Sequence, residues 1–425
     1  MLSTLRNAWN LPDVRKKILN TLLLIIIFRL GFAIPVPFMD RQVAAQIATG
    51  GSQLLSYMDM MTGGAFSKFN IFGLSIYPYI SASIIIQLLT IAIPRLEELS
   101  KEGEEGRKKI QQYTKWAALV LGLVESITIL NNSRLFGNAV HAENFFQHLV
   151  VYATLLGGMM FLVWLGDLIT EKGVGNGISI LIFVGIISRI PTTARGWIGA
   201  MKAGQMAFWK PLLFLVIAFF IVVFTVAIQE GERKVPIQYA KRVVGRKMYG
   251  GQATHIPMKV NMAGVMPVIF AGAILSLPVT VAESFKGAVG TFFRNYFTPS
   301  GTVGFWVYNI VQILFIIVFA YFYTAVQFNT VEYAKNLQQN GGFVPGIRPG
   351  RPTSEFLSKI SNRITFIGAI CLAILVLIPT VLSALFHLRI SFGGTALIIV
   401  VGVVLETIRQ LETMLTMRHY KGFLK

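Results

Sequence analysis

The sequence predicts an all-α integral membrane protein with ten transmembrane helices, and three observations support this fold class. First, 54% of the 425 residues are hydrophobic and only 13% are charged, whereas soluble domains carry about 25% charged residues. Second, ten apolar segments approach the roughly 20 residues that a helix needs to cross a bilayer core. Third, Lys and Arg are distributed unequally between alternate loops, as the positive-inside rule describes.

The expected spans are defined to within a few residues by runs of apolar side chains. The clearest is 211–228, which the polar residues Gln229 and Glu230 follow at once, and the weakest is 174–191, which opens with glycines. The first span is long and carries no small-residue cleavage site, so we expect it to be retained rather than removed as a signal peptide. In chain order the spans are 18–37, 71–93, 116–132, 149–169, 174–191, 211–228, 262–282, 305–326, 364–386 and 392–409.

The loop charges predict the orientation of these spans. With the N-terminus inside, 27 Lys and Arg residues fall on the inner side and 10 in the outer loops, and Arg29 lies within the first span. An even number of spans then places the C-terminus inside as well. The net charge of +19 has a plain explanation in this arrangement, because basic inner loops hold the topology and meet anionic lipid headgroups.

Ten spans divide into two halves of five, 1–195 and 196–425. An inverted repeat of this kind places binding or conducting sites at the interface between the halves. The repeat is inferred from the number and spacing of the spans, because strong internal sequence identity is not apparent.

Two segments of the first half have more than one interpretation. Residues 54–70 are Met-rich and too polar to span, so they form either an ordinary outer loop or a short helix folded back into a cavity. In the second span, Ile80 and Ile84 share one helical face. They belong either to a lipid-facing or packed stripe or, given nearby Ser81 and Ser83, to a helix contact or wet path.

The two largest inner loops, 229–261 and 329–363, are basic. In the second loop, Arg348 stands in the run Gly-Ile-Arg-Pro-Gly, where proline and glycine restrict the backbone and display the side chain at a defined place. A rigidly displayed Arg suits an acidic or phosphate-rich partner. Taken singly, most of these charges are equally compatible with a role in topology alone.

We expect no cofactor and no metal. The single cysteine, Cys371, has no neighbouring Cys or His. Residues 173–177, Gly-Val-Gly-Asn-Gly, follow a helix rather than a strand and lack the Lys-Ser/Thr ending of a phosphate-binding loop. A tight turn between helices is the better interpretation.

Two other functional classes would require residues of particular kinds within the spans. A secondary transporter would place ionisable residues at mid-membrane, and the candidates are few: Arg29, Glu125, Asp167 and Glu406. An intramembrane enzyme would need a Ser–His, paired-Asp or His–Glu cluster in the spans, which the sequence lacks.

Several motifs, in order along nearly the whole chain, resemble the bacterial SecY family of protein-translocation channels. They include Thr-Gly-Gly-Ala at 62–65, Pro-Tyr-Ile-Ser-Ala-Ser-Ile-Ile-Ile-Gln at 78–87, the charged run 102–107 and Gly-Asn-Gly-Ile-Ser-Ile at 175–180. The second half contributes Tyr-Ala-Lys-Arg at 239–242, Lys-Val-Asn-Met-Ala-Gly-Val at 259–265, Val-Pro-Gly-Ile-Arg-Pro-Gly at 344–350 and Phe-Gly-Gly-Thr at 392–395.

The resemblance implies ten helices in two halves around a central hourglass pore, without catalytic activity. It implies a protein-conducting channel that passes unfolded secretory polypeptides and releases hydrophobic segments through a lateral gate. The implied pore ring is Ile80, Ile84, Ile178, Ile182, Ile269 and Ile399. The segment 56–69 looks like the family's plug, with Met60, Thr62, Gly63, Gly64 and Phe66, and the implied gate residues are Gln87, Thr90 and Asn176.

The resemblance also implies partners and a location. The loops 229–261 and 329–363 look like the docking surface for the ribosome and the SecA motor ATPase, through Arg233, Lys234, Lys241, Arg242, Arg246, Lys247, Arg348 and Arg351. SecE-like and SecG-like small membrane subunits, signal sequences and nascent or unfolded polypeptides are the other expected partners, along with anionic lipids. The expected location is the bacterial cell (inner) membrane, with both termini cytoplasmic.

Overall fold

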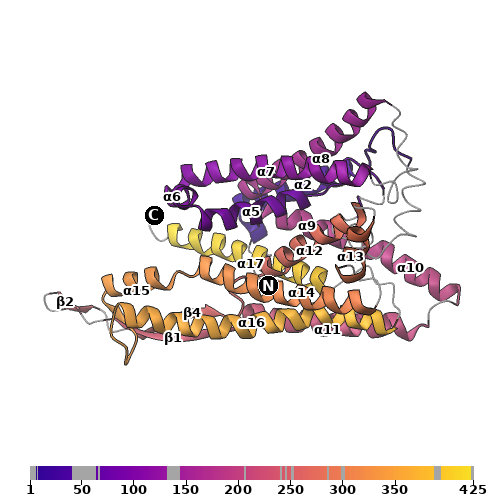
Figure 1. Ribbon diagram of the computed structural model, residues 1–425. Coiled ribbons are helices and arrows are strands. Elements are labelled where there is room, and N and C mark those ends of the chain that lie inside the picture. Colours follow the sequence, from indigo (N-terminus) through magenta and orange to yellow (C-terminus); the bar gives the residue numbers. More distant parts are fainter. Residues whose placement is uncertain are drawn as a thin grey trace.

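A computed structural model describes residues 6, 8–40, 64–65, 68–131, 144–204, 207–239, 242–244, 247–249, 253–284, 287–297, 302–386 and 394–422. Long helices run roughly parallel in two groups (Figure 1). One group contains α5 (Tyr77–Ala92), α7 (Glu104–Asn131) and α8 (Phe145–Lys172). The other contains α11 (Trp209–Glu230), α14 (Thr302–Gln327) and α16 (Arg351–Phe386). Between the groups lie α9 (Gly177–Ile187), α12 (Met266–Ser284) and α17 (Gly394–Gly422).

A helix overlaps each of the ten predicted spans, although several boundaries differ. Helices α7 and α16 begin well before the spans 116–132 and 364–386, and α17 continues well beyond 392–409. The first helix, α2 (Pro12–Gly31), begins and ends about six residues before the predicted span. The fifth span continues beyond 191, because α9 is followed after a short break by α10 (Ile190–Lys202).

Six helical segments of the described chain are long and apolar enough to cross a membrane. A seventh is added if α5 and α6 (Pro94–Lys101), which meet at a bend of 101°, count as one span. By the same criterion α2, α7 and α12 do not qualify within the described residues. The structure therefore supports a multi-span membrane protein.

The outer faces of the long helices carry exposed large apolar side chains. Phe219 on α11 is 65% exposed, and Leu30 on α2 is also 65% exposed. Water-soluble monomers rarely expose apolar surface as continuous as this. These faces are suited to contact with lipid, in agreement with the predicted membrane class.

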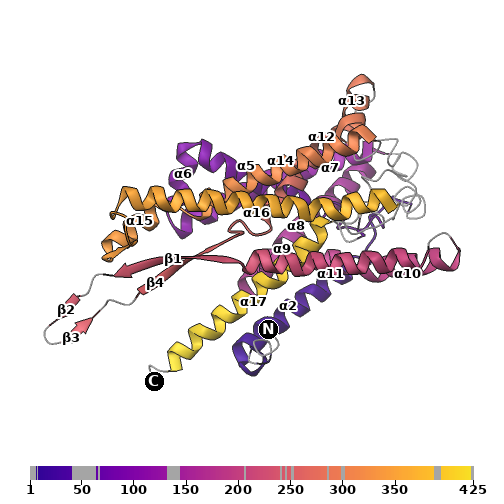
Figure 2. The ribbon, with the colours of Figure 1, turned by 90° about the horizontal axis from the view of Figure 1, so that it is seen from below.

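The prediction of an all-α chain is incomplete, because the inner loop 229–261 forms strands. Strands β1 (Glu232–Tyr239) and β4 (Ala253–Lys259) pair antiparallel, with Glu232 opposite Lys259. The short strands β2 (Arg242–Val244) and β3 (Lys247–Tyr249) extend this hairpin away from the helices (Figure 2). Val235 and Ile237 are buried while their neighbours are exposed, which is the period-2 pattern of a strand with one buried face.

The second inner loop, 329–363, also has regular structure. Its helix α15 (Thr330–Gln339) is followed by strand β5 (Gly342–Phe343), which pairs with β1. The first turns of α16 complete it, because that helix begins at Arg351. The two inner loops are thus joined through one small sheet, at the end of the molecule where α6 and the C-terminal end of α17 also lie (Figure 1).

One large apolar cluster joins the two groups of helices. It contains Leu165 from the first group, Phe319 from the second, and Phe72 from the segment before α5. Helix α12 contributes Ile269 and α17 contributes Ile399 to the same cluster. The largest apolar cluster of the described residues therefore lies between the two halves, where the sequence predicted a functional interface.

A short segment outside the spans, 68–76, helps to hold the first half together. Asn70 pairs with Pro35 in an isolated β-bridge, and its Oδ1 accepts a hydrogen bond of 3.0 Å from the Phe72 amide. Phe72 then stacks on Phe28 of α2 and on Phe161 of α8, with ring centroids 5.9 and 6.1 Å apart. The chain that enters α5 is thereby anchored to two neighbouring helices.

Candidate functional site

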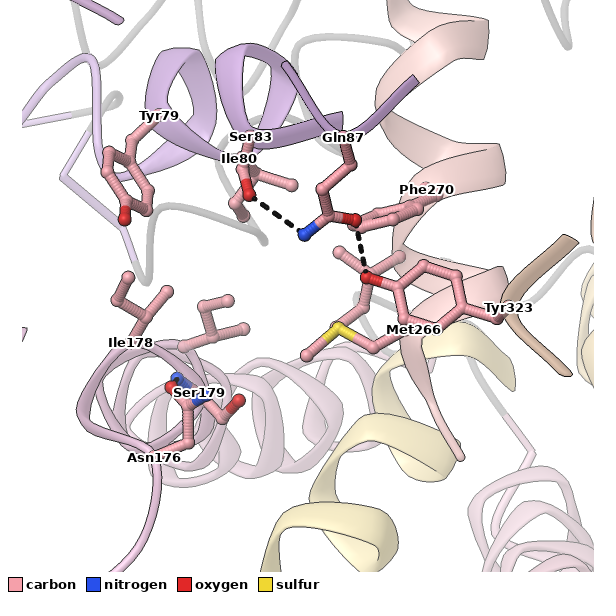
Figure 3. A pocket seen from close by; sticks show the side chains of 12 residues that line it. Tyr79, Ile80, Ser83, Gln87, Asn176, Ile178, Ser179, Met266, Phe270 and Tyr323 are labelled. Carbon is pink, nitrogen blue, oxygen red and sulfur yellow. Dashed lines mark hydrogen bonds between the residues drawn. The ribbon is translucent and has the colours of Figure 1, made fainter. Parts of the chain in front are cut away.

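A cavity of about 190 Å³ lies where α5, α9, α12 and α14 meet. Figure 3 shows the side chains that line it, with α5 on one side and the start of α9 on the other. The lining residues are Tyr79, Ile80, Ser83, Gln87, Asn176, Ile178, Ser179, Ile182, Met266, Ile269, Phe270 and Tyr323.

Four of the six isoleucines that the family resemblance placed in a pore ring line this cavity: Ile80, Ile178, Ile182 and Ile269. Ile84 and Ile399 are buried in the same apolar cluster without being among the lining residues. These isoleucines offer no hydrogen bonds to water, whereas other lining residues, such as Ser83, Gln87 and Asn176, are polar.

A second cavity, of about 310 Å³, adjoins the first and shares Ser179, Met266 and Ile269 with it. Its other walls come from the end of α11, the β4–α12 connection and the middle of α17. We call it the vestibule. Unlike the first cavity, it is lined by charged side chains, including Lys259, Glu406 and Arg409.

Among the described residues, two tyrosine hydroxyls donate hydrogen bonds across the seam between the two halves beside the first cavity. The Tyr323 hydroxyl on α14 donates to Gln87 Oε1 on α5 over 2.8 Å (Figure 3). The Tyr77 hydroxyl at the start of α5 donates to the carbonyl of Ala273 on α12 over 2.5 Å. Gln87 Nε2 also donates to Ser83 Oγ on its own helix, over 3.4 Å. Of the predicted gate residues, Gln87 therefore bridges the halves directly.

The other two predicted gate residues, Thr90 and Asn176, form hydrogen bonds to residues close to them in the chain. Thr90 donates its hydroxyl to the Ile86 carbonyl of its own helix, over 2.8 Å, and is not among the residues lining the cavity. Asn176 lines the cavity and caps α9, because its Oδ1 accepts a hydrogen bond of 3.3 Å from the Ser179 amide. Sequence reasoning missed Tyr323, since nothing in the local pattern distinguishes it from Tyr321 two residues earlier.

Most of the predicted plug lies outside the described residues, including Met60, Thr62, Gly63 and Phe66. Gly64 and Ala65 are described and buried, and Ala65 belongs to the large apolar cluster. Gly64 has φ +89°, a conformation that glycine adopts without strain. The Asn70 amide donates to the Ala65 carbonyl over 3.3 Å, which joins this short piece to the segment before α5.

Backbone amides of the glycine-rich turn before α9 donate hydrogen bonds to side chains of neighbouring helices. The amides of Val174 and Gly177 donate to the hydroxyls of Thr21 and Thr170, over 3.0 and 2.9 Å. The Gly175 amide donates to the Gln410 side chain on α17. A phosphate cradle needs free amides, so the arrangement fits the predicted turn between helices.

The described residues of the predicted docking set belong to β1, β2, β3, the start of α16 and the turn before it. The hairpin lies at one end of the molecule (Figure 2). Arg233 and Lys234 are exposed on β1, and Arg348 is exposed in the turn before α16. Arg351 begins α16 and pairs with Glu355, with Nε 3.0 Å from Oε1. Arg242 and Lys247 belong to β2 and β3, whereas Lys241 and Arg246 lie outside the described residues.

The comparisons with known proteins identify the family. The family model described as SecY matches residues 70–408. The chain belongs to the SecY family. A protein translocase subunit SecY of Thermotoga maritima is 39% identical over all of this chain and 98% of its own length. The corresponding protein of Thermus thermophilus is 41% identical, again over all of this chain and 98% of its own length.

Solved structures show the same fold at lower sequence identity. A protein-conducting channel is similar with a TM-score of 0.68 and 18% identity, over 94% of this chain and 92% of that one. Sec61 in a canine ribosome–channel complex from the endoplasmic reticulum is similar with a TM-score of 0.63 and 17% identity, over the same shares. The predicted SecY resemblance is thus confirmed, and the helical arrangement is that of known members of this fold.

Proposed function

We propose that this SecY-family chain forms a channel that passes unfolded secretory polypeptides across the membrane and releases hydrophobic segments sideways into the bilayer. The observation that carries the proposal is the isoleucine-lined cavity between the two halves, which continues into a charged vestibule. The printed names of the relatives, translocase subunits and a protein-conducting channel, support the same function.

The isoleucines of the lining suit a neck that must be closed to ions and still open for a polypeptide. A narrow constriction of branched aliphatic side chains dewets and resists ions. The same side chains form no specific hydrogen bonds, so they accept substrates of very different sequence. In this proposal Ile80, Ile84, Ile178, Ile182, Ile269 and Ile399 form the neck, and the segment 56–69 is the plug that fills it at rest.

The seam between α5 and α7 on one side and α12 and α14 on the other is the proposed lateral gate. A hydrophobic segment of about 20 residues is more stable in the bilayer than in a wet channel, so it needs a sideways exit. Gln87, Thr90 and Asn176 are the proposed gate residues. Tyr323 joins them because its hydroxyl bonds Gln87 across the seam.

Ten helices in two inverted halves, 1–195 and 196–425, complete the proposed architecture. The proposed location is the bacterial inner membrane, with both termini cytoplasmic. SecE-like and SecG-like subunits, a SecA-type motor and the ribosome are the proposed partners, the last two through the basic hairpin and Arg348. The similar Sec61 structure, a ribosome–channel complex, supports a ribosome partner. The channel itself performs no chemistry in this proposal.

The rival function, a small-solute transporter, loses support from the contacts of two of its four candidate residues, Asp167 and Arg29. Asp167 pairs with Lys115 over 2.7 Å and accepts from Gln111 over 3.1 Å. Arg29 donates to the Val184 carbonyl over 2.7 Å and lies over the Phe32 ring. These groups are engaged in contacts that hold helices together.

The test is uptake into vesicles that contain the purified full-length chain with co-purified small subunits and a motor ATPase. We expect ATP-dependent protection of a preprotein from added protease, and no concentrative uptake of amino acids, sugars or ions. Preprotein that stays fully digestible, in vesicles that accumulate a small solute, would contradict the proposal.

A further inference from the structure

The vestibule contains a buried polar group without a partner. Gln229, at the end of α11, is 7% exposed, and its Nε2 has no hydrogen-bond partner. This amide lies close to Gly402 on α17, where an added Cβ would come within 3.2 Å of Nε2. Leaving a buried donor unpaired costs free energy. Gln229 is also one of the residues that line the vestibule, so a ligand bound there could supply the missing acceptor.

A cation lines the same cavity. Lys259, the last residue of β4, is half-buried, and its ammonium makes no hydrogen bond or ion pair within 4.0 Å among the described residues. Burial lowers the pKa of Lys259 and the nearby Arg409 lowers it further, while Glu230 and Glu232 act in the opposite direction. The charge of Lys259 is thus only partly compensated by its surroundings.

Four of the neighbouring charges are already paired with one another. Arg409 donates to Glu230 over 2.7 Å and to the Gln229 carbonyl over 2.8 Å. Glu232 lies 3.5 Å from Lys234. Glu406 also lines the vestibule, and its carboxylate makes no hydrogen bond to a described residue. Gln229 and Lys259 are therefore two hydrogen-bond donors that the vestibule presents to a ligand.

We propose that Gln229 and Lys259 bind a carboxylate side chain of the polypeptide that enters the vestibule. This inference rests on the proposed function, and it specifies which side chains of the polypeptide bind in the vestibule. A carboxylate accepts from both donors, and charge-assisted hydrogen bonds are about twice as strong as neutral ones. The vestibule shares Met266 and Ile269 with the isoleucine-lined cavity, so an acidic residue held here lies next to an apolar segment held in the neck.

The proposal is tested by binding of two peptides to the full-length chain in lipid nanodiscs. Both peptides carry the same apolar segment of about 20 residues. One continues in a tail with three Asp residues and the other in the same tail with three Asn residues. Fluorescence anisotropy should give a dissociation constant about tenfold lower for the Asp peptide, as expected of hydrogen bonds to a charged group. The difference should shrink with added salt, because salt screens charge pairs.

Three variants assign the preference to the two donors. Lys259→Gln should reduce it to less than about twofold, and Lys259→Glu should make a Lys-tailed peptide bind better than the Asp peptide. Gln229→Leu should reduce the preference severalfold, and it removes an unpaired buried amide, so it keeps the test valid if changes at Lys259 prevent folding. Lys335→Gln is the control, since Lys335 is exposed on α15 and does not line the vestibule.

Each outcome has a defined meaning. Equal binding of the Asp and Asn peptides to the unchanged chain would overturn the carboxylate site and leave the channel function standing. A loss of preference in Lys335→Gln as large as in Lys259→Gln would overturn it too, because general surface charge would then explain the effect. Binding of neither peptide would overturn the proposed function, and this inference with it.

Discussion

Two buried isoleucines allow the neck to be tested at the scale of single residues. Ile269 on α12 is 7% exposed and lines both the isoleucine cavity and the vestibule. Ile316 on α14 is fully buried in a different apolar cluster, formed with α11, α12 and α16. The two side chains are alike in type and similar in burial, and they differ in whether they line these two cavities.

We expect Ile269→Asn to make the resting channel leak ions, because a polar side chain wets an apolar constriction. Ile316→Asn should leave the bilayer silent and only destabilise the fold, by about 1–3 kcal/mol for an unsatisfied buried amide. Single-channel conductance of the purified proteins in planar bilayers measures the difference. Silent bilayers for both variants would show that Ile269 is a packing residue.

At the scale of helices, the seam between α5 and α14 is joined by a side-chain hydrogen bond at the first cavity. Tyr323 supplies the donor and Gln87 the acceptor. Tyr321, two residues earlier on α14, points elsewhere, since its hydroxyl donates to the Asn362 carbonyl on α16 over 3.3 Å. Removing this bond should shift the proposed gate from its closed toward its open arrangement.

Tyr323→Phe should make the gate open more easily, because the bond to Gln87 would stabilise only the closed arrangement. A net hydrogen bond is worth about 1 kcal/mol, so a preprotein with a weakened signal sequence should be translocated about fivefold better. Tyr321→Phe is the matched control and should leave this efficiency unchanged. The same efficiency in both variants would remove the gate role of Tyr323.

At the scale of the whole molecule, the hairpin β1–β4, the α15–α16 connection and the C-terminal end of α17 lie at one end (Figures 1 and 2). The charge distribution of 27 inner to 10 outer Lys and Arg predicts that this end is cytoplasmic. The arrangement makes a single test of orientation possible.

A cytoplasm-active reporter fused after Lys425 or within 240–250 should be active, and a periplasm-active reporter near 200–208 should be active as well. Both results follow from basic loops being retained on the inner side. Enzyme activity of the fusions in intact cells is the measurement. A periplasm-active reporter that works within 240–250 would overturn the orientation.

The same end of the molecule carries the proposed docking arginine. Arg348 is exposed between Ile347 and Pro349 and makes no ion pair with a described residue, whereas Arg351 pairs with Glu355. Arg348→Glu should reduce preprotein translocation severely and leave the amount of protein in the membrane nearly unchanged, because a charge reversal repels an acidic or phosphate-rich partner. Arg351→Glu should have the milder effect, and normal transport by Arg348→Glu would exclude the role.

Local sequence was sufficient for the membrane class, the helices and the basic loops. A helix lies over each predicted span because hydropathy is a property of about 20 consecutive residues. The hairpin 232–259 was missed although Val235 and Ile237 alternate with exposed residues, since the apolar run is short and lies in a loop rich in charge. The family motifs supplied the isoleucines, four of which line one cavity.

By itself the sequence determined the membrane class and the places of the helices, and it predicts which loops remain inside, because each of these depends on residues close together in the chain. Only the tertiary structure decided which side chains meet across the two halves. Gln87 and Tyr323 are 236 positions apart, and Gln229 and Lys259 come together with Gly402 only when α11, β4 and α17 converge. Contacts between distant segments depend on how helices pack, and no local pattern of hydrophobicity or charge records that packing.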